Sequence, residues 1–225
     1  LKDTLFPLIN LYYPANTTYN VNVSNLNYTI DDVSAARCWY SNNSGYRNSS
    51  SVSAGTNFTG VVSRDGINNW TLYCNDSFSR VNYITVFFTR DVTNPNATLL
   101  TPLNNTYTNT VMQNLSVNAS DNINLDNATL FVYNFSGTQV NQTDVDISGT
   151  RDVFGIVYTF LYDGIFKWLY RITDIANNQF YTVNFTITID TINPLVNITY
   201  PLNITYNVDV IYLDYTYSDL NPGSC

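Results

Sequence analysis

The sequence predicts an all-β chain built from tandem β-sandwich domains, and three observations support this. The first is residue choice, because the chain has 19 Tyr and 12 Phe but one Met and no Glu or His, so that strand formers outweigh strong helix formers. The second is that the chain repeats itself. The third is the alternation of apolar and polar residues between turn signals, which is typical of short strands with one buried face.

One segment occurs three times, as DTLFPLINLYYPANTTY, DVTNPNATLLTPLNNTY and DTINPLVNITYPLNITY. Its copies start 88 and 99 residues apart, which are lengths typical of one sandwich domain. We therefore expect a first domain at residues 1–90, a second at 91–189 and the first part of a third at 190–225. Each copy carries two prolines and an Asn-x-Ser/Thr sequon at fixed spacing, at Pro7, Pro14 and Asn16, at Pro95, Pro102 and Asn104, and at Pro194, Pro201 and Asn203.

The later halves of the first two repeats also align, at an offset of 98 residues. Asp65-Gly66 and Asp163-Gly164 predict tight turns, and each is followed by an alternating strand led by Trp70 or Trp168. A second turn then begins at Asp76 or Asp174, and a last strand follows it. This order predicts the strand, turn and strand that close each sandwich.

The paired prolines predict how the domains are joined. Proline blocks helix and favours extended chain, so we expect stiff junctions and domains arranged as beads on a rod. The sequon beside the second proline in turn predicts that sugar covers the junctions.

The stretch DGIFKWLYRITDIANNQFYTVNFTITIDTINP resembles the end of the immunoglobulin-like repeats found in tandem on bacterial and archaeal surface proteins. Asn177 stands where that family has Gly. The resemblance implies immunoglobulin-like sandwiches and a place in a stalk, coat or filament. CWYS and LYCND are similar to segments of large archaeal surface proteins and imply the same context.

The sequence contains 18 sequons, whereas random order of the same residues would give about seven. On the predicted strands several of the asparagines oppose the apolar face, so their glycans would project into solvent. We therefore expect an N-glycosylated, extracellular protein. The sequon asparagines are Asn16, Asn22, Asn27, Asn42, Asn48, Asn57, Asn69, Asn75, Asn96, Asn104, Asn114, Asn118, Asn127, Asn134, Asn141, Asn184, Asn197 and Asn203.

The cysteines fit the same repeats. Cys38 and Cys74 fall on two expected strands of one repeat, which predicts a disulfide, the alternative being two buried thiols. Aligned by repeat, Leu130 takes the position of Cys38, and Ile172 that of Cys74.

Cys225 lies 24 residues after Pro201, as Cys38 does after Pro14. It is therefore expected to be unpaired within this chain, as the first cysteine of a third domain. That domain would be completed by further repeats of the same chain or, alternatively, by strand donation from another copy.

Charge and composition exclude several functions. Without His and Glu the chain lacks the usual catalytic base, the commonest zinc ligand and half of the carboxylate repertoire, so we expect no enzyme and no cofactor. Asp31-Asp32 and Asp144/Asp146 lie in polar, turn-like segments, which favours solvated loops. The net charge is −8 with scattered cations, which argues against nucleic acid, and the longest apolar run is about ten residues, too short for a membrane span.

Two kinds of binding site stay open. Asp76, Asp91, Asp174 and Asp190 lie at junctions or nearby turns and offer the hard oxygen ligands that calcium prefers, although aspartates there can equally cap turns. Tyr40, Tyr46 and Tyr73 could form a sugar-stacking platform, or serve packing instead.

The sequence as a whole favours a structural segment of an extracellular surface filament, stalk or coat. An adhesin or carbohydrate-binding module is the alternative, and an accessory domain of an extracellular hydrolase is the least favoured reading.

Overall fold

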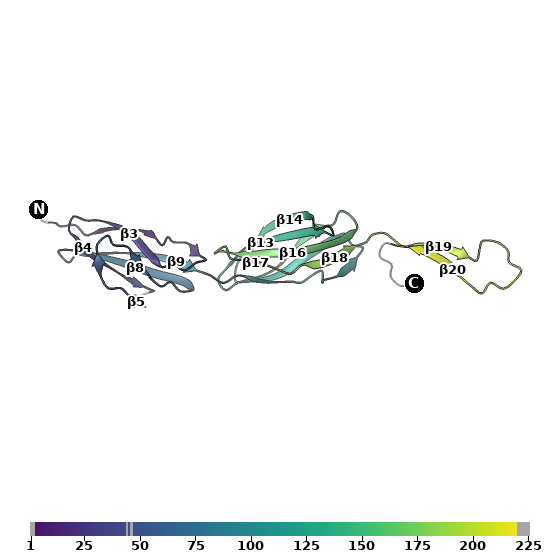
Figure 1. The fold of residues 1–225 in the computed structure, drawn as a ribbon, viewed down its shortest axis with the longest axis horizontal. Coiled ribbons are helices and arrows are strands. Elements are labelled where there is room, and N and C mark those ends of the chain that lie inside the picture. Colours follow the sequence, from purple (N-terminus) through teal and green to yellow (C-terminus); the bar gives the residue numbers. More distant parts are fainter. Residues whose placement is uncertain (1–2, 44, 46, 220–225) are drawn as a thin grey trace.

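The computed structural model describes residues 3–43, 45 and 47–219, so that Tyr46 and Cys225 lie outside the described residues. It consists of strands that form two complete β-sandwiches and a hairpin, arranged one after another along the long axis (Figure 1). The expected all-β fold is thereby confirmed. The described part of the chain contains no helix that could cross a membrane.

Domain 1, the first sandwich, has a three-stranded sheet in the order β1-β3-β7 and a six-stranded sheet in the order β2-β9-β8-β4-β5, with β6 also paired to β4. The strands are β1 (Leu8–Tyr13), β2 (Thr18–Tyr19), β3 (Asn25–Asp31), β4 (Ala35–Asn42), β5 (Arg47–Asn48), β6 (Val52–Ser53), β7 (Phe58–Thr59), β8 (Gly66–Asp76) and β9 (Val81–Arg90).

Domain 2 repeats this plan with sheets in the orders β10-β12-β15 and β11-β18-β16-β13-β14, with β17 also paired to β16. Its strands are β10 (Asn96–Leu99), β11 (Thr106–Thr108), β12 (Met112–Ser120), β13 (Leu125–Asn134), β14 (Gln139–Asp146), β15 (Arg151–Thr159), β16 (Gly164–Asp174), β17 (Gln179–Tyr181) and β18 (Phe185–Ile189).

Each domain has its own core, and the strand that contains Trp70 or Trp168 contributes three side chains to it, as its alternating pattern predicted. Trp70, Leu72 and Cys74 of β8 are fully buried in domain 1, and Trp168, Tyr170 and Ile172 of β16 are fully buried in domain 2. Alternate residues of one strand share a face, so a single register places all three side chains of each strand inside. The Tyr170 hydroxyl donates to the main-chain oxygen of Leu115 (2.8 Å) and so links the two sheets.

In both sandwiches the second proline of the repeat lies inside the domain rather than at a junction. β1 ends at Tyr13, the Tyr13-Pro14 peptide is cis, and the chain then crosses to the other sheet, where β2 pairs with β9 in parallel. The Thr101-Pro102 peptide is also cis and stands between β10 and β11 in the same way. The expectation that both prolines belong to the junction was therefore wrong for the second one.

The third repeat forms an antiparallel hairpin of β19 (Leu195–Tyr200) and β20 (Asp214–Ser218) with the register of β1 and β3. Ile198 faces Tyr215 as Leu11 faces Tyr28. Tyr28 is 2% exposed within the core of domain 1, whereas Tyr215 is 45% exposed. The face that is buried in domain 1 is therefore open in the third repeat.

Candidate functional site

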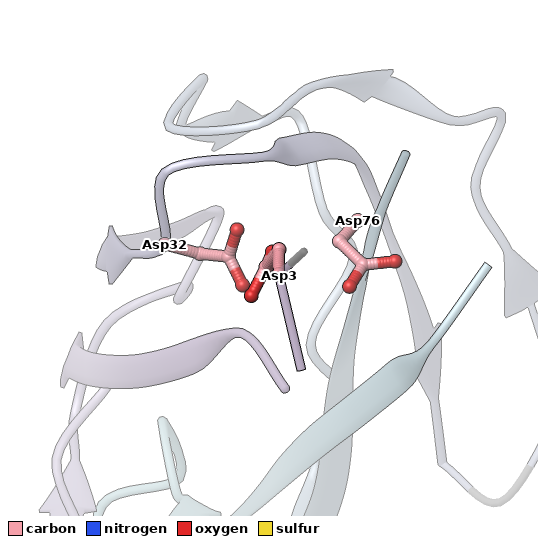
Figure 2. Close-up of side chains that lie close together, drawn as sticks. All are labelled: Asp3, Asp32 and Asp76. Carbon is pink, nitrogen blue, oxygen red and sulfur yellow. The ribbon is translucent and has the colours of Figure 1, made fainter. Parts of the chain in front are cut away.

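Each sandwich gathers three aspartates at the end where the chain enters it. Cluster 1 consists of Asp3, Asp32 and Asp76, and cluster 2 of Asp91, Asp121 and Asp174; within each, one carboxylate oxygen per residue lies within 4.8 Å of the others. Figure 2 shows the three side chains of cluster 1.

Strand direction explains why these aspartates meet. The first aspartate of each cluster precedes the first strand, the second follows the strand antiparallel to it, and the third ends the strand led by the tryptophan. All three positions therefore lie at one end of the sandwich.

Sequence reasoning identified half of these residues. Asp91 and Asp174 lie together in cluster 2, while Asp76 lies in cluster 1, with the aspartate that opens its own repeat. Asp190 belongs to neither cluster, and its main-chain N–H donates to the oxygen of Thr108 (3.0 Å).

Asp3 and Asp121 were not among the predicted ligands. Asp32 was expected in a solvated loop, whereas it is half-buried and lies in cluster 1. A signal existed in the repeat, because Asp32 and Asp121 follow the entering aspartates by 29 and 30 residues.

Cluster 1 contains its own cation. Arg80 Nε lies 2.7 Å from Asp76 Oδ2. Arg80 Nη2 lies 3.1 Å from Asp3 Oδ2; these two atoms form an ion pair but not a hydrogen bond. The Ser34 hydroxyl donates to the same Asp3 oxygen, and this bond, more than any other contact, holds the pKa of Asp3 below its ordinary value. Burial opposes ionisation of Asp76, but main-chain and guanidinium donors from Arg80 hold its pKa low.

In cluster 2, Ile123 and Asn178 take the positions of Ser34 and Arg80, so the serine hydroxyl and the positive charge are missing, although Asn178 Nδ2 still donates to Asp174 Oδ2 (2.8 Å). Asp91 and Asp174 are fully buried, and Asp91 Oδ2 has no hydrogen-bond partner. Burial raises the pKa of Asp174, and the neighbouring Asp91 carboxylate adds to the rise. The ion pairs among the described residues join Arg80 to Asp3 and Asp76 and Arg90 to Asp65, so none reaches cluster 2.

Most sequon asparagines are exposed or half-buried, but Asn42 is fully buried and its Nδ2 donates to the Val62 oxygen (3.1 Å). This packing leaves no room for a sugar on Asn42 in the folded domain, so Asn42 differs from the other predicted glycan sites. In Asn57 and Asn104 only Oδ1 accepts a main-chain hydrogen bond, which is compatible with a glycan on Nδ2.

The sequons beside the second prolines are separated by one strand, β1 or β10, from the junction at which their own repeat begins. Asn16 is exposed after β1, and the Thr17 oxygen next to it accepts from Thr89 near the end of the last strand. These sequons therefore lie toward the following junction, and sugar there stays a prediction.

The expected disulfide is present between Cys38 and Cys74, which face each other on β4 and β8. The same register in domain 2 brings Ala128 opposite Ile172, while Leu130 faces Tyr170. Aligning Leu130 with Cys38 was therefore wrong, because a shift of two residues keeps a side chain on the same face and both alignments look apolar.

Of the three candidate tyrosines, Tyr40 and Tyr73 lie in the described part of the chain, and these two do not share one platform. Tyr40 packs edge-on against Phe58 beside the core, whereas Tyr73 stacks on Trp39 with ring centres 5.6 Å apart. Trp39 and Tyr73 line an open hollow together with residues that include Asn48 and Asn69. An aromatic surface therefore exists, and among the described residues Tyr73 belongs to it whereas Tyr40 does not.

No protein-family model matches the sequence, and the comparison with curated proteins gave no match either. Among solved structures, the chain is similar to the fibronectin(III)-like modules of CbhA from Clostridium thermocellum, at 14% identity and a TM-score of 0.43, covering 81% of this chain and 93% of that one.

A tetra-tandem repeat in the extending region of a large adhesion protein is similar at 18% identity and a TM-score of 0.42, covering 86% of this chain and 51% of that one. The Bacteroides ovatus mixed-linkage glucan utilization locus protein SGBP-B, in complex with a heptasaccharide, is similar at 11% identity and a TM-score of 0.31, covering 83% and 48%. The strand pairing of this chain and its two separate cores themselves define two sandwiches in tandem.

Proposed function

We propose that this chain is a spacer segment of an extracellular, N-glycosylated surface stalk, coat or filament. The observation that carries the proposal is the way Asp91 joins two sandwiches of the same plan. Its N–H donates to the Tyr19 oxygen of domain 1 (2.8 Å), while its own oxygen accepts from Asn178 Nδ2 of domain 2 (3.0 Å). A junction bonded on both sides holds successive domains in line, as a spacer requires (Figure 1).

The surface chemistry supports an extracellular place. The cross-strand disulfide fits an oxidising compartment, and the exposed sequons would add a hydrated sugar layer that shields the strand edges. We propose further repeats of the same chain, or a strand donated by another copy, as the partner that covers the open face of β19 and β20. We propose neither a catalytic role nor a cofactor beyond the glycans.

The test is the intact mass of the protein recovered from its own cells, before and after enzymatic or chemical removal of N-glycans. We expect a mass well above that of the bare polypeptide, falling to it on deglycosylation, and surface labelling with a membrane-impermeant reagent. A native mass equal to the bare polypeptide, together with protection from the reagent, would refute the extracellular role.

The hollow beside Trp39 and Tyr73 favours one second candidate, a sugar-binding adhesin. Stacked aromatic faces are suitable platforms for sugar rings. This function predicts saturable binding of an oligosaccharide that Trp39→Ala weakens at least tenfold, with Phe87→Ala, another exposed aromatic of domain 1, as the matched control. Equal binding by both variants would exclude the hollow as the site.

A further inference from the structure

The two aspartate clusters are equivalent in position but not in charge balance. In both, Oδ1 of the third aspartate accepts hydrogen bonds from the main-chain N–H groups two and four residues later. Both distances are 2.9 Å for Asp76. They are 2.8 and 2.9 Å for Asp174. In both, the entering aspartate accepts through Oδ1 from the N–H two residues later, at 3.0 Å for Asp3 and 3.1 Å for Asp91. The main-chain donors to the first and third aspartates are therefore the same in both clusters, whereas Asp32 accepts from one main-chain N–H and Asp121 from two.

In cluster 1, Asp3 Oδ2 is held by the Ser34 hydroxyl and the Arg80 guanidinium. In cluster 2, the equivalent oxygen is Asp91 Oδ2, which is buried without a hydrogen-bond partner. Asp121 Oδ1 is a second buried oxygen without one, since the N–H groups of Ile123 and Asn124 bond to Oδ2. Asp32 Oδ2 of cluster 1 also lacks a hydrogen-bond partner, so the two clusters differ at the entering aspartate. A buried carboxylate oxygen without a partner is costly unless a proton or a cation compensates it, and no ion pair among the described residues brings a cation to cluster 2.

The spacing of the carboxylates suits calcium. Calcium binds oxygen ligands at about 2.3–2.6 Å, so that two ligands on opposite sides of the ion are about 4.8 Å apart. The three carboxylate oxygens of cluster 2, like those of cluster 1, lie no more than 4.8 Å from one another, which is close enough for one ion to contact all three. Magnesium needs shorter bonds and a stricter octahedral arrangement, and it gives up its water reluctantly.

We propose that cluster 2 binds one Ca²⁺ through Asp91, Asp121 and Asp174, and that Ser34 and Arg80 replace this ion in domain 1. Because Asp91 is also the residue that bonds both domains, the ion would stiffen the junction between domains 1 and 2. The entry to domain 1 has a permanent internal cation and needs no calcium. This inference does not depend on the proposed surface role.

The test is calorimetric titration of the calcium-free full chain with CaCl₂, with circular dichroism to confirm that each variant is folded. We expect one site per chain, with a dissociation constant on the order of 10⁻⁴–10⁻³ M as in extracellular modules. Asp121→Asn should weaken calcium binding at least tenfold, whereas Asp32→Asn, the matched change in cluster 1, should leave calcium binding unchanged. Asn178→Arg should abolish binding by placing a guanidinium in cluster 2.

A gain of binding provides the sharpest control, because misfolding cannot mimic it. Ser34→Ile combined with Arg80→Asn gives cluster 1 the side chains of cluster 2, and we expect a second equivalent of calcium. The proposal is overturned if the wild-type chain takes up no calcium at 10 mM, if Asp32→Asn and Asp121→Asn weaken binding equally, or if Mg²⁺ binds as tightly as Ca²⁺. A stoichiometry that stays at one in the double variant would overturn the claim that Ser34 and Arg80 replace the ion.

Discussion

Arg80 and Asn178 make the same hydrogen bond in two different domains. Each donates from its side chain to the main-chain oxygen of the aspartate that enters its domain, Arg80 Nη1 to Asp3 (2.8 Å) and Asn178 Nδ2 to Asp91 (3.0 Å). The bond is conserved between the repeats but the positive charge is not. The repeats therefore share a scaffold and differ in how they balance three carboxylates.

The first prediction concerns the pH response of the two clusters in calcium-free solution. The ordinary pKa of an aspartate carboxyl is 3.8, and the pKa of Asp76 is lower. Ionised Asp76 therefore stabilises domain 1 above pH 3.8, and this stabilisation is lost as the pH falls through the lowered pKa of Asp76. The pKa of Asp174 is raised, so its ionisation destabilises domain 2, and this penalty is relieved as the pH falls through the raised value.

Carboxyl NMR titration of the full chain in EDTA checks this. We expect the midpoint of Asp76 below 3.8 and that of Asp174 above it, with Arg80→Asn moving Asp76 upward. Coincident midpoints in the unmodified chain would show that Arg80 does not distinguish the two clusters.

The second prediction concerns the disulfide. Replacing Cys38 by Ala and Cys74 by Ile installs the facing pair of domain 2, Ala128 and Ile172, and removes the cross-link. Closing a loop over a separation of 36 residues stabilises by roughly 3 to 4 kcal/mol on the loop-entropy model. Denaturant unfolding should show that loss in domain 1 alone.

In the matched control, Ala128→Cys with Ile172→Cys should form a disulfide in domain 2 and raise its unfolding midpoint. Unchanged stability of domain 1 after the Ala and Ile replacement would contradict the loop-entropy account.

The third prediction concerns glycan occupancy. Asn42 is fully buried, so we expect it to carry no sugar, whereas the exposed Asn16 and Asn104 should be occupied. Site-by-site mass spectrometry of glycopeptides from the native protein measures this. A glycan found on Asn42 of the folded protein would contradict the packing of β4 against Val62.

Much of the fold follows from the sequence, because the relevant signals are local and repeated. The alternation around Trp70 and Trp168 fixed which face is buried, and the cysteine pair followed from strand membership. The register between strands did not follow, which is why Leu130 was aligned where Ala128 lies. Alternation identifies a face but leaves a slip of two residues undetected.

The aspartate clusters show the same limit. Asp121 was not among the predicted ligands, because its importance depends on three chain segments that meet only in the folded domain. The burial of Asn42 was equally hidden, since its sequon has the same form as the exposed ones. Such properties depend on tertiary neighbours, which one-dimensional patterns do not contain.

The measurement that tests the spacer account most directly is small-angle X-ray scattering of the monomeric full chain at millimolar calcium. Two sandwiches and a hairpin in line predict a pair-distance distribution with an early maximum, set by the width of one sandwich, and a long tail from distances along the array (Figure 1). We expect Asp121→Asn to shorten that tail by loosening the junction. A single symmetric peak for the unmodified chain would mean that the domains fold back on each other, and would contradict the account.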